Sequence, residues 1–223
     1  MSKKLNQICI QSCINSYGGE HGKVRPVFKD KIDFQLGHVE GHVGEYGKKI
    51  ILVFRGSDGT ADWIDNLKFG KRKSPAGWFK KRYRLHQGFM EQYESIKPKI
   101  SRILTDYTVK EIVVTGHSLG GALATICAAD LSKFFNVELI TFGSPRVGTP
   151  LFARYVNKSI KNITRYRYGS DPVSAVPFFG WGFHHTKGHH RYIKKLTWYQ
   201  KLKNIVTASA FDHEPEKYKW MLK

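Results

Sequence analysis

The hydrophobic positions of the chain alternate between short β-type runs and longer helical series. An apolar, β-branched run over 49–54 predicts a buried strand, and a second run over 111–115 predicts another. Between them, apolar residues recur every three or four positions over 89–105. This spacing predicts an amphipathic helix, with Pro98 as its one interruption.

The same pattern predicts the other elements of the fold. They are a short helix over 4–16, a glycine-rich bent hairpin over 34–46, an alanine-rich helix over 121–134, strands over 137–142 and 165–168, a loop-like stretch after Pro177, and a helical segment over 215–222. Strand, helix and strand in succession imply right-handed parallel crossovers. We therefore expect a three-layer α/β domain with the hairpin as its antiparallel edge. No repeat or linker divides the chain, so residues 1–223 are expected to form one domain.

Composition excludes several classes of protein. In 223 residues, 41% are hydrophobic and 13% are aromatic, which supplies a sizeable core and excludes general disorder. No apolar run approaches the roughly 18 residues of a membrane span. The basic N-terminus is not followed by the apolar region of a secretory signal. We expect a cytoplasmic protein, or one that is processed or exported by a non-classical route.

The net charge of +19 is the most unusual number in the composition. Residues 71–84 hold seven basic residues and no acidic one, and 187–203 form a second basic stretch. Such stretches bind nucleic acid or anionic membrane surfaces, or simply keep a protein soluble. No nucleic-acid-binding motif occurs, so no specific nucleic acid is expected as a partner.

The cysteines and histidines do not form a metal-binding pattern. Cys9, Cys13 and Cys127 include no CxxC pair, so we expect buried thiols without a disulfide framework. Histidines cluster over 184–190, but their spacing marks no dedicated metal site. Neither a metal nor a cofactor is predicted.

The segment 116–120 (GHSLG) has the form G-x-S-x-G and lies between a predicted strand and a predicted helix. This is the context of a nucleophile elbow, a tight turn that presents a serine hydroxyl to a histidine base. Side chains at 116 and 120 would collide with the neighbouring strand or helix, which explains both glycines. The N–H of Leu119 can donate to a developing oxyanion. Ser118 is thus the predicted nucleophile.

Further motifs follow one another along the chain in a distinctive order. They are 53–57 (VFRGS), 62–64 (DWI), 85–89 (LHQGF), 116–124 (GHSLGGALA), 141–148 (TFGSPRVG), 170–173 (SDPV) and 212–213 (DH) ahead of Tyr218. Together they resemble the class 3 lipases, α/β-hydrolases typified by the triacylglycerol lipases of filamentous fungi. The resemblance covers most of the chain. It implies the α/β-hydrolase fold, a three-layer sandwich around a mostly parallel sheet.

The resemblance also implies that Asp171 is the acid of a catalytic triad, following the strand over 165–168. The order Ser, Asp, His places the base after Asp171. Five histidines compete for that role: His184, His185, His189, His190 and His213. The resemblance falls on His213, and it implies that His184 or His185 is a further family histidine that is not the base.

The resemblance implies two more parts of the site. Ser57 would supply a second oxyanion donor through its backbone N–H and hydroxyl. Residues 58–69 would form a lid, in which Trp63, Ile64 and Leu67 share one face of a short amphipathic helix. An ordinary surface helix explains the same pattern. The basic stretch 71–84 follows the lid and is therefore expected near the mouth of the site.

These features predict a serine carboxylic-ester hydrolase that cleaves acyl esters, with acylglycerols as the expected substrates. A phospholipase A1 acting on anionic lipid interfaces is an alternative within the same chemistry. A non-catalytic basic binding module on a hydrolase scaffold is an alternative of a different class. The expected partners are a lipid or ester substrate and an anionic membrane surface, and the oligomeric state is left open.

Overall fold

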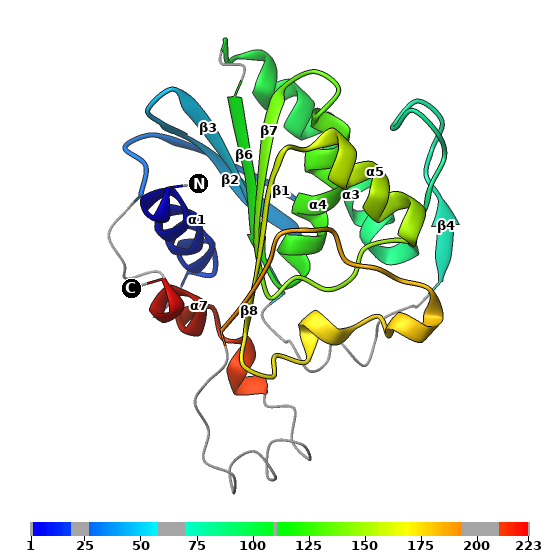
Figure 1. The fold of residues 1–223 in the computed structure, drawn as a ribbon. Coiled ribbons are helices and arrows are strands. Elements are labelled where there is room, and N and C mark those ends of the chain that lie inside the picture. Colours follow the sequence, from blue (N-terminus) through cyan, green and yellow to red (C-terminus); the bar gives the residue numbers. More distant parts are fainter. Residues whose placement is uncertain (1, 19–26, 58–69, 109–110, 193–209, 223) are drawn as a thin grey trace, which may run out of the picture.

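A mostly parallel sheet lies at the centre of the computed structural model, which describes residues 2–18, 27–57, 70–108, 111–192 and 210–222 (Figure 1). Within these residues the strand order is β1-β2-β3-β6-β7-β8-β9. The strands are β1 (Lys31–Leu36), β2 (Val39–Tyr46), β3 (Lys49–Phe54), β6 (Glu111–His117), β7 (Asn136–Phe142), β8 (Asn162–Tyr168) and β9 (His189–Tyr192). The hairpin β1–β2 and the pair β2–β3 are antiparallel, and the other pairs are parallel. The predicted antiparallel edge is confirmed.

Helices cover both faces of the sheet (Figure 1). One face carries α1 (Lys3–Ser16) and α7 (Pro215–Met221), and the other carries α3 (Gln87–Thr105), α4 (Leu119–Leu131) and α5 (Pro150–Ser159). The side chains of β3 alternate between the two cores. Ile50, Leu52 and Phe54 belong to one cluster, and Ile51 and Val53 belong to the other. A strand buried on both faces reads as a continuous apolar run, which confirms the predicted three-layer architecture.

The segment expected to be a loop after Pro177 contains more regular structure than the sequence indicates. It holds the 3-10 helix η2 (Phe179–Trp181) and the strand β9, which pairs in parallel with β8. β9 lies at the edge of the sheet and lacks an apolar run. Backbone hydrogen bonds define it, beginning with Arg165 N–H to Gly188 O at 2.6 Å. Hydrophobic periodicity does not detect such a strand.

The three cysteines are buried and free, which confirms the predicted burial of their thiols. Cys13 Sγ lies 3.8 Å from Thr115 Oγ1, between α1 and β6. Among the helices that the structure describes, none is long and apolar enough to cross a membrane.

The basic stretch 71–84, which was expected near the mouth of the site, extends away from that edge of the sheet. It forms a hairpin of β4 (Lys71–Lys73) and β5 (Arg84–His86). At its base, Lys71 Nζ lies 5.0 Å from the centre of the Phe183 ring. Its tip, residues 80–82, lies beside the C-terminal ends of α4 and α5. Because both helices end where the next parallel strand begins, the hairpin tip lies near the edge opposite Ser118 (Figure 1).

Candidate active site

Ser118 lies at a sharp turn between β6 and α4. β6 ends at His117 and α4 begins at Leu119. The backbone of Ser118 has φ 59° and ψ −130°, a strained conformation for a residue with a side chain. Two hydrogen bonds hold the turn: Ser118 N–H donates to Phe142 O at 3.0 Å, and Gly121 N–H donates to Ser118 O at 2.9 Å. The turn is therefore anchored to the neighbouring strand β7.

The glycines of the elbow are required by close backbone contacts. A Cβ on Gly116 would lie 2.2 Å from Gly120 O, and a Cβ on Gly120 would lie 2.3 Å from Phe54 O. Both distances are far shorter than any real carbon contact. The predicted reason for glycine at these two positions is confirmed.

Asp171 and His213 form a buried pair beside the elbow. Asp171 follows β8, and His213 ends the 3-10 helix η3 (Ala210–His213). His213 Nδ1 lies 2.9 Å from Asp171 Oδ1, with side-chain exposures of 2% and 0%. A Cβ on Gly143, the residue after the acceptor of the Ser118 N–H bond, would lie 2.8 Å from both Asp171 Oδ2 and His213 Cε1. The elbow of Ser118 and the Asp171–His213 pair thus lie at the same end of β7, around Phe142 and Gly143.

Three further groups donate hydrogen bonds to the Asp171 carboxylate. Val173 N–H donates to Oδ1 at 2.8 Å, Ser174 Oγ donates to Oδ2 at 3.0 Å, and the Tyr218 hydroxyl also donates to Oδ2. Burial opposes ionisation of Asp171, but the interactions with His213 and Tyr218 outweigh it and lower the pKa of the carboxyl. Asp171 is therefore ionised at neutral pH. Since the carboxylate only accepts, Nδ1 of His213 carries the proton.

His213 Nε2 is the nitrogen left available for chemistry. It is buried and has no hydrogen-bond partner among the residues that the structure describes. The imidazole of His117, next to Ser118 in the chain, stacks on the His213 ring with centroids 4.5 Å apart. An imidazole held by a carboxylate on one nitrogen and free on the other is the arrangement a general base needs.

Tyr17 and His117 support His213 through a chain of hydrogen bonds, and the sequence gives no sign of this. His117 Nε2 lies 2.7 Å from the backbone oxygen of His213, and the Tyr17 hydroxyl lies 2.7 Å from His117 Nδ1. A carbonyl only accepts, so Nε2 of His117 carries the proton and Nδ1 accepts from Tyr17. Burial, together with the nearby His213, lowers the pKa of His117 to about 3. His117 is thus neutral, and its ring supports the His213 ring on which it stacks.

Asp212 fixes the segment that carries His213. Its Oδ2 accepts a hydrogen bond from Ser170 N–H at 2.9 Å. Gly169 lies so close to this carboxylate that a Cβ would stand 2.4 Å from Asp212 Oδ2, and its φ of +47° also favours glycine. The sequence marked Asp212 only as part of a motif.

The other four candidate histidines lie away from Asp171. His185 Nε2 lies 2.8 Å from Ser174 O, and burial together with Arg165 lowers the pKa of His185 to about 2. The His184 ring packs on Phe179, with centroids 4.5 Å apart. His189 and His190 are exposed on β9. Of the five, the structure brings His213 to Asp171.

The predicted oxyanion donors lie on both sides of Ser118. Leu119 is the first residue of α4, so its N–H has no acceptor within the helix. On the other side, a Cβ on Gly56 would lie 3.1 Å from Ser118 Cβ, which places the half-buried Ser57 next to the elbow. The predicted lid over 58–69, with Trp63, Ile64 and Leu67, lies outside the described residues.

Among the described residues, no group of three His, Cys, Asp or Glu side chains is arranged to hold a metal ion.

The buried neutral His117 makes the fold sensitive to acid. In the unfolded chain His117 titrates near pH 6.5, whereas in the folded protein its pKa is about 3. Between these values the unfolded state binds the extra proton, so stability is present above pH 6.5 and declines as the pH falls. We expect this residue alone to lower the free energy of unfolding by about 2 kcal/mol between pH 7 and pH 5.

Urea unfolding at several pH values measures this effect. Because His42, His86 and His185 also have lowered pKa values, the comparison is between the protein and His117→Gln. The variant should lose less stability on acidification, and an identical loss in both proteins would contradict the assignment.

Comparison with known proteins places this geometry in a family. The family model described as lipase (class 3) matches residues 51–181, which is more than half of the chain. The chain belongs to the class 3 lipase family. Its predicted α/β-hydrolase fold is confirmed by the solved structure of the Rhizomucor miehei triacylglyceride lipase, with a TM-score of 0.74 and 25% identity. That similarity covers 96% of this chain and 94% of the other.

Curated relatives in the family are similar over part of their length. A secreted mono- and diacylglycerol lipase of Fusarium solani is 40% identical over 146 residues, which is 62% of this chain and 42% of the relative. A lipase of Rhizomucor miehei is 36% identical over 152 residues, 64% of this chain and 41% of the relative. The chain thus spans about two fifths of the length of these relatives.

Proposed function

We propose that the protein is a serine carboxylic-ester hydrolase that cleaves acyl esters through an acyl-enzyme. The observation that carries this proposal is the buried Asp171–His213 pair beside the elbow of Ser118. Membership of the class 3 lipase family supports it.

The proposed reaction uses each group for one task. His213 Nε2 takes the proton of Ser118 as Oγ attacks the ester carbonyl, and it then returns that proton to the leaving alcohol. Asp171 holds the tautomer of His213 and stabilises the imidazolium. The N–H of Leu119 and the donors of Ser57 stabilise the oxyanion of the tetrahedral intermediate. Water then releases the acid by the same steps.

Hydrolysis of p-nitrophenyl butyrate tests this proposal. Steady turnover that a serine-directed phosphonate abolishes, with one phosphonate bound per chain at Ser118, is the expected result. A basic binding module on a hydrolase scaffold would instead retain DNA in a salt-sensitive manner without turnover, and that outcome would overturn the proposal.

Acylglycerols are the substrate class we propose. The names of the relatives support this choice, since they include mono- and diacylglycerol lipases and lipases. The phospholipase A1 alternative also has support, because a chloroplastic phospholipase A1 of Arabidopsis thaliana is 28% identical over 151 residues. Hydrolysis rates on a diacylglycerol emulsion and on anionic phospholipid vesicles distinguish the two.

We also propose an anionic lipid surface as the partner of the catalytic edge. Phe178, Phe179 and Trp181 have exposures of 63%, 57% and 49%, an unusual gathering of large aromatic side chains in contact with water. They follow Asp171 in the chain, at and just before η2, in the yellow segment of Figure 1. Lys71, at the base of the β4–β5 hairpin, lies beside Phe183, which is two residues after Trp181 in the chain. Aromatic rings flanked by cations favour the interface of an anionic membrane.

Vesicle sedimentation measures the contribution of these rings. Each exposed phenylalanine that enters lipid is worth roughly 1 kcal/mol or more, so Phe178→Ala with Phe179→Ala should weaken binding to anionic vesicles by about 10- to 100-fold. The matched control is Phe134→Ala, since this ring is 74% exposed just beyond α4, at the opposite edge of the sheet. Equal weakening by the control would contradict the proposed surface.

A further inference from the structure

A groove of about 570 Å³ lies between the β4–β5 hairpin and α5. One wall is the hairpin tip, residues 80–83. The other wall is one face of α5, on which Leu151, Arg154, Tyr155 and Lys158 recur with helical spacing. Ser132 and Lys133, just beyond α4, also line the groove. The groove has the size of a small-molecule site.

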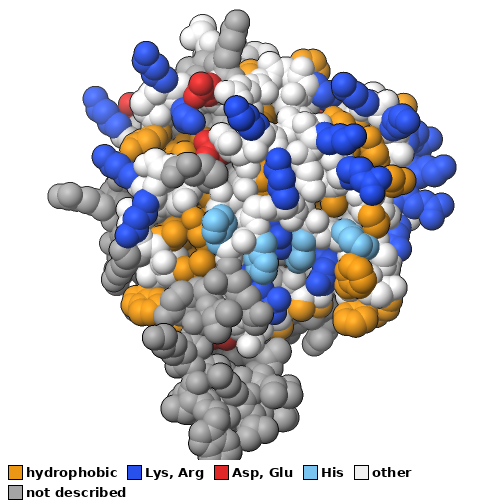
Figure 2. Space-filling model, in the orientation of Figure 1, with side chains coloured by type: hydrophobic (Ala, Val, Ile, Leu, Met, Phe, Trp, Pro, Cys, Tyr) orange, Lys and Arg blue, Asp and Glu red, His pale blue; other side chains and the backbone are white. Residues whose placement is uncertain are grey.

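The side chains around the groove carry an excess of positive charge. None of its described lining residues is acidic. Six are cationic: Lys80, Lys81, Arg82, Lys133, Arg154 and Lys158. Asp130 pairs with Lys133 at 2.9 Å. The other five cations have no carboxylate within ion-pair distance among the described residues. Figure 2 shows Lys and Arg side chains gathered over the part of this face where β4 and α5 lie, with few carboxylates among them.

Part of this charge is held in place by the fold. Arg82 Nε donates to Ser74 O at 2.9 Å, and Lys133 Nζ donates to Gly77 O at 3.0 Å. Between the walls, the rings of Tyr83 and Tyr155 stack with centroids 4.9 Å apart. The stacked rings join the hairpin to the helix, so the two walls that carry the cations are in direct contact without a ligand.

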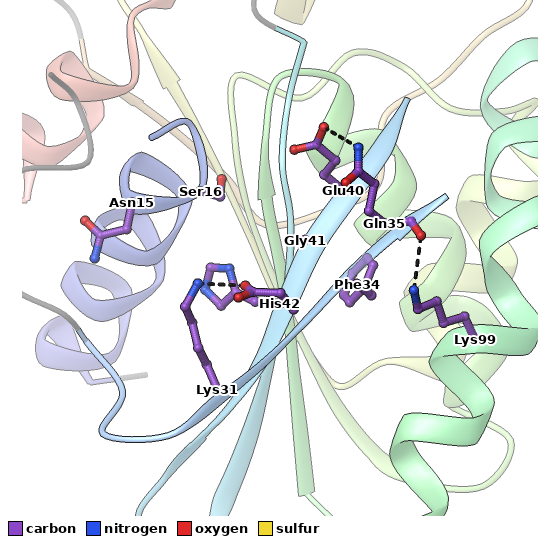
Figure 3. A pocket seen from close by; sticks show the side chains of 10 residues that line it. Asn15, Ser16, Lys31, Phe34, Gln35, Glu40, Gly41, His42 and Lys99 are labelled. Atoms are coloured by element: carbon purple, nitrogen blue, oxygen red, sulfur yellow. Dashed lines mark hydrogen bonds and ion pairs between the residues drawn. The ribbon is translucent and has the colours of Figure 1, made fainter. Parts of the chain in front are cut away.

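The polar pocket beside β1 differs from the groove in its balance of charge (Figure 3). Its charged groups are engaged with neighbouring residues: Lys31 pairs with Asp33 at 2.6 Å, Lys99 donates to Gln35 O at 3.2 Å, and Glu40 pairs with Arg55 at 2.5 Å. Charges of both signs balance within it. In the groove five of the six cations lack a carboxylate partner among the described residues, and their mutual repulsion favours the binding of an anion.

We propose that this groove is a binding site for a molecule with two or more neighbouring phosphate groups, either free or as the headgroup of a lipid. Arg82 and Arg154 on opposite walls offer forked donors to phosphate oxygens, and the lysines add point charges. A single nucleic-acid strand fits less well, because the two tyrosine rings are already stacked on each other and leave no platform for bases. The groove lies near the edge opposite Ser118, so this inference does not depend on ester hydrolysis.

Isothermal titration with inositol hexakisphosphate at 0.15 M salt tests the site, with inorganic phosphate as the single-phosphate comparison. The variant Lys80→Glu with Arg154→Glu changes one cation on each wall. The matched control is Lys4→Glu with Lys48→Glu, which makes the same change in net charge at exposed positions on α1 and the β2–β3 turn. We expect the groove variant to weaken binding at least 10-fold and the control less than 3-fold.

Three further measurements complete the test. Inositol hexakisphosphate should raise the Tm of the protein and should bind at least 100-fold more tightly than inorganic phosphate. Vesicles with and without phosphatidylinositol bisphosphate separate the two sources of the phosphates. Binding to the vesicles that contain this lipid, but not to free inositol hexakisphosphate, assigns a lipid headgroup. Binding to free inositol hexakisphosphate, but not to these vesicles, assigns a soluble ligand. Short-ester turnover should be unchanged in both variants. Equal loss of binding in both variants, equal affinity for inorganic phosphate, or tighter binding to oligonucleotides that grows with their length would overturn the proposal.

Discussion

Replacing Ser118 with alanine should lower the turnover of a p-nitrophenyl ester by about 10³-fold or more, while the protein stays folded. The acyl-enzyme route requires an oxygen at this position, and alanine supplies none. The side chain is small and lies on the strained turn between β6 and α4, so the substitution removes one atom and changes little packing. The rate that remains would reflect substrate binding and the oxyanion donors alone.

The matched control for this prediction is Ser144→Ala. Ser144 is also buried near the elbow, where its Cβ would lie 2.7 Å from a Cβ on Gly121, but its hydroxyl bonds to Pro145 O. It should retain most of the activity, with circular dichroism and Tm confirming the fold of both variants. If purified Ser118→Ala retained more than a tenth of the rate, the nucleophile would have to be another residue.

Replacing His213 with alanine should cost as much activity as the serine variant. The variant removes the only imidazole that the described structure brings to Asp171, and with it the group that can accept the proton of Ser118. Because members of a triad act as a unit, the double variant of Ser118 and His213 should be little worse than either single one. Single-turnover kinetics with a p-nitrophenyl ester measure all three.

His185→Ala is the control that decides between the histidines. His185 is bound to Ser174 O and not to Asp171, so its loss should affect stability more than chemistry. An inactive His185 variant beside an active His213 variant would reverse the assignment of the base. Unfolding curves for both proteins show whether lost activity reflects lost structure, since Asp171 is left without its imidazole in the His213 variant.

Local patterns in the sequence carry much of the fold. The strand over 49–54 and the hairpin before it follow from apolar runs and glycines, and the structure places β3 at the predicted residues. The helix α5 was not predicted, although its buried residues Phe152, Ala153, Tyr155 and Val156 recur with helical spacing.

Some parts of the candidate site are likewise encoded locally in the sequence, and others depend on contacts between distant residues. The elbow of Ser118 is a local motif, so its turn and its glycines could be predicted from sequence. The choice among five histidines could not be made from spacing alone, because contact between Asp171 and His213 depends on how η3 returns to the end of β8. The support of His117 by Tyr17 joins residues 100 positions apart. No local pattern encodes such a contact.

The route of the chain also sets the order in which the site is completed during synthesis. Val173 and Ser174 leave the ribosome directly after Asp171, but His213 and Tyr218 follow it by 42 and 47 residues. At about 5–20 residues per second, that interval lasts roughly 2–9 s. During this interval the strands that precede Asp171 can pair and the elbow can form, but Asp171 has not yet met the imidazole of His213. The nascent chain thus carries the proposed nucleophile, Ser118, well before the proposed base, His213.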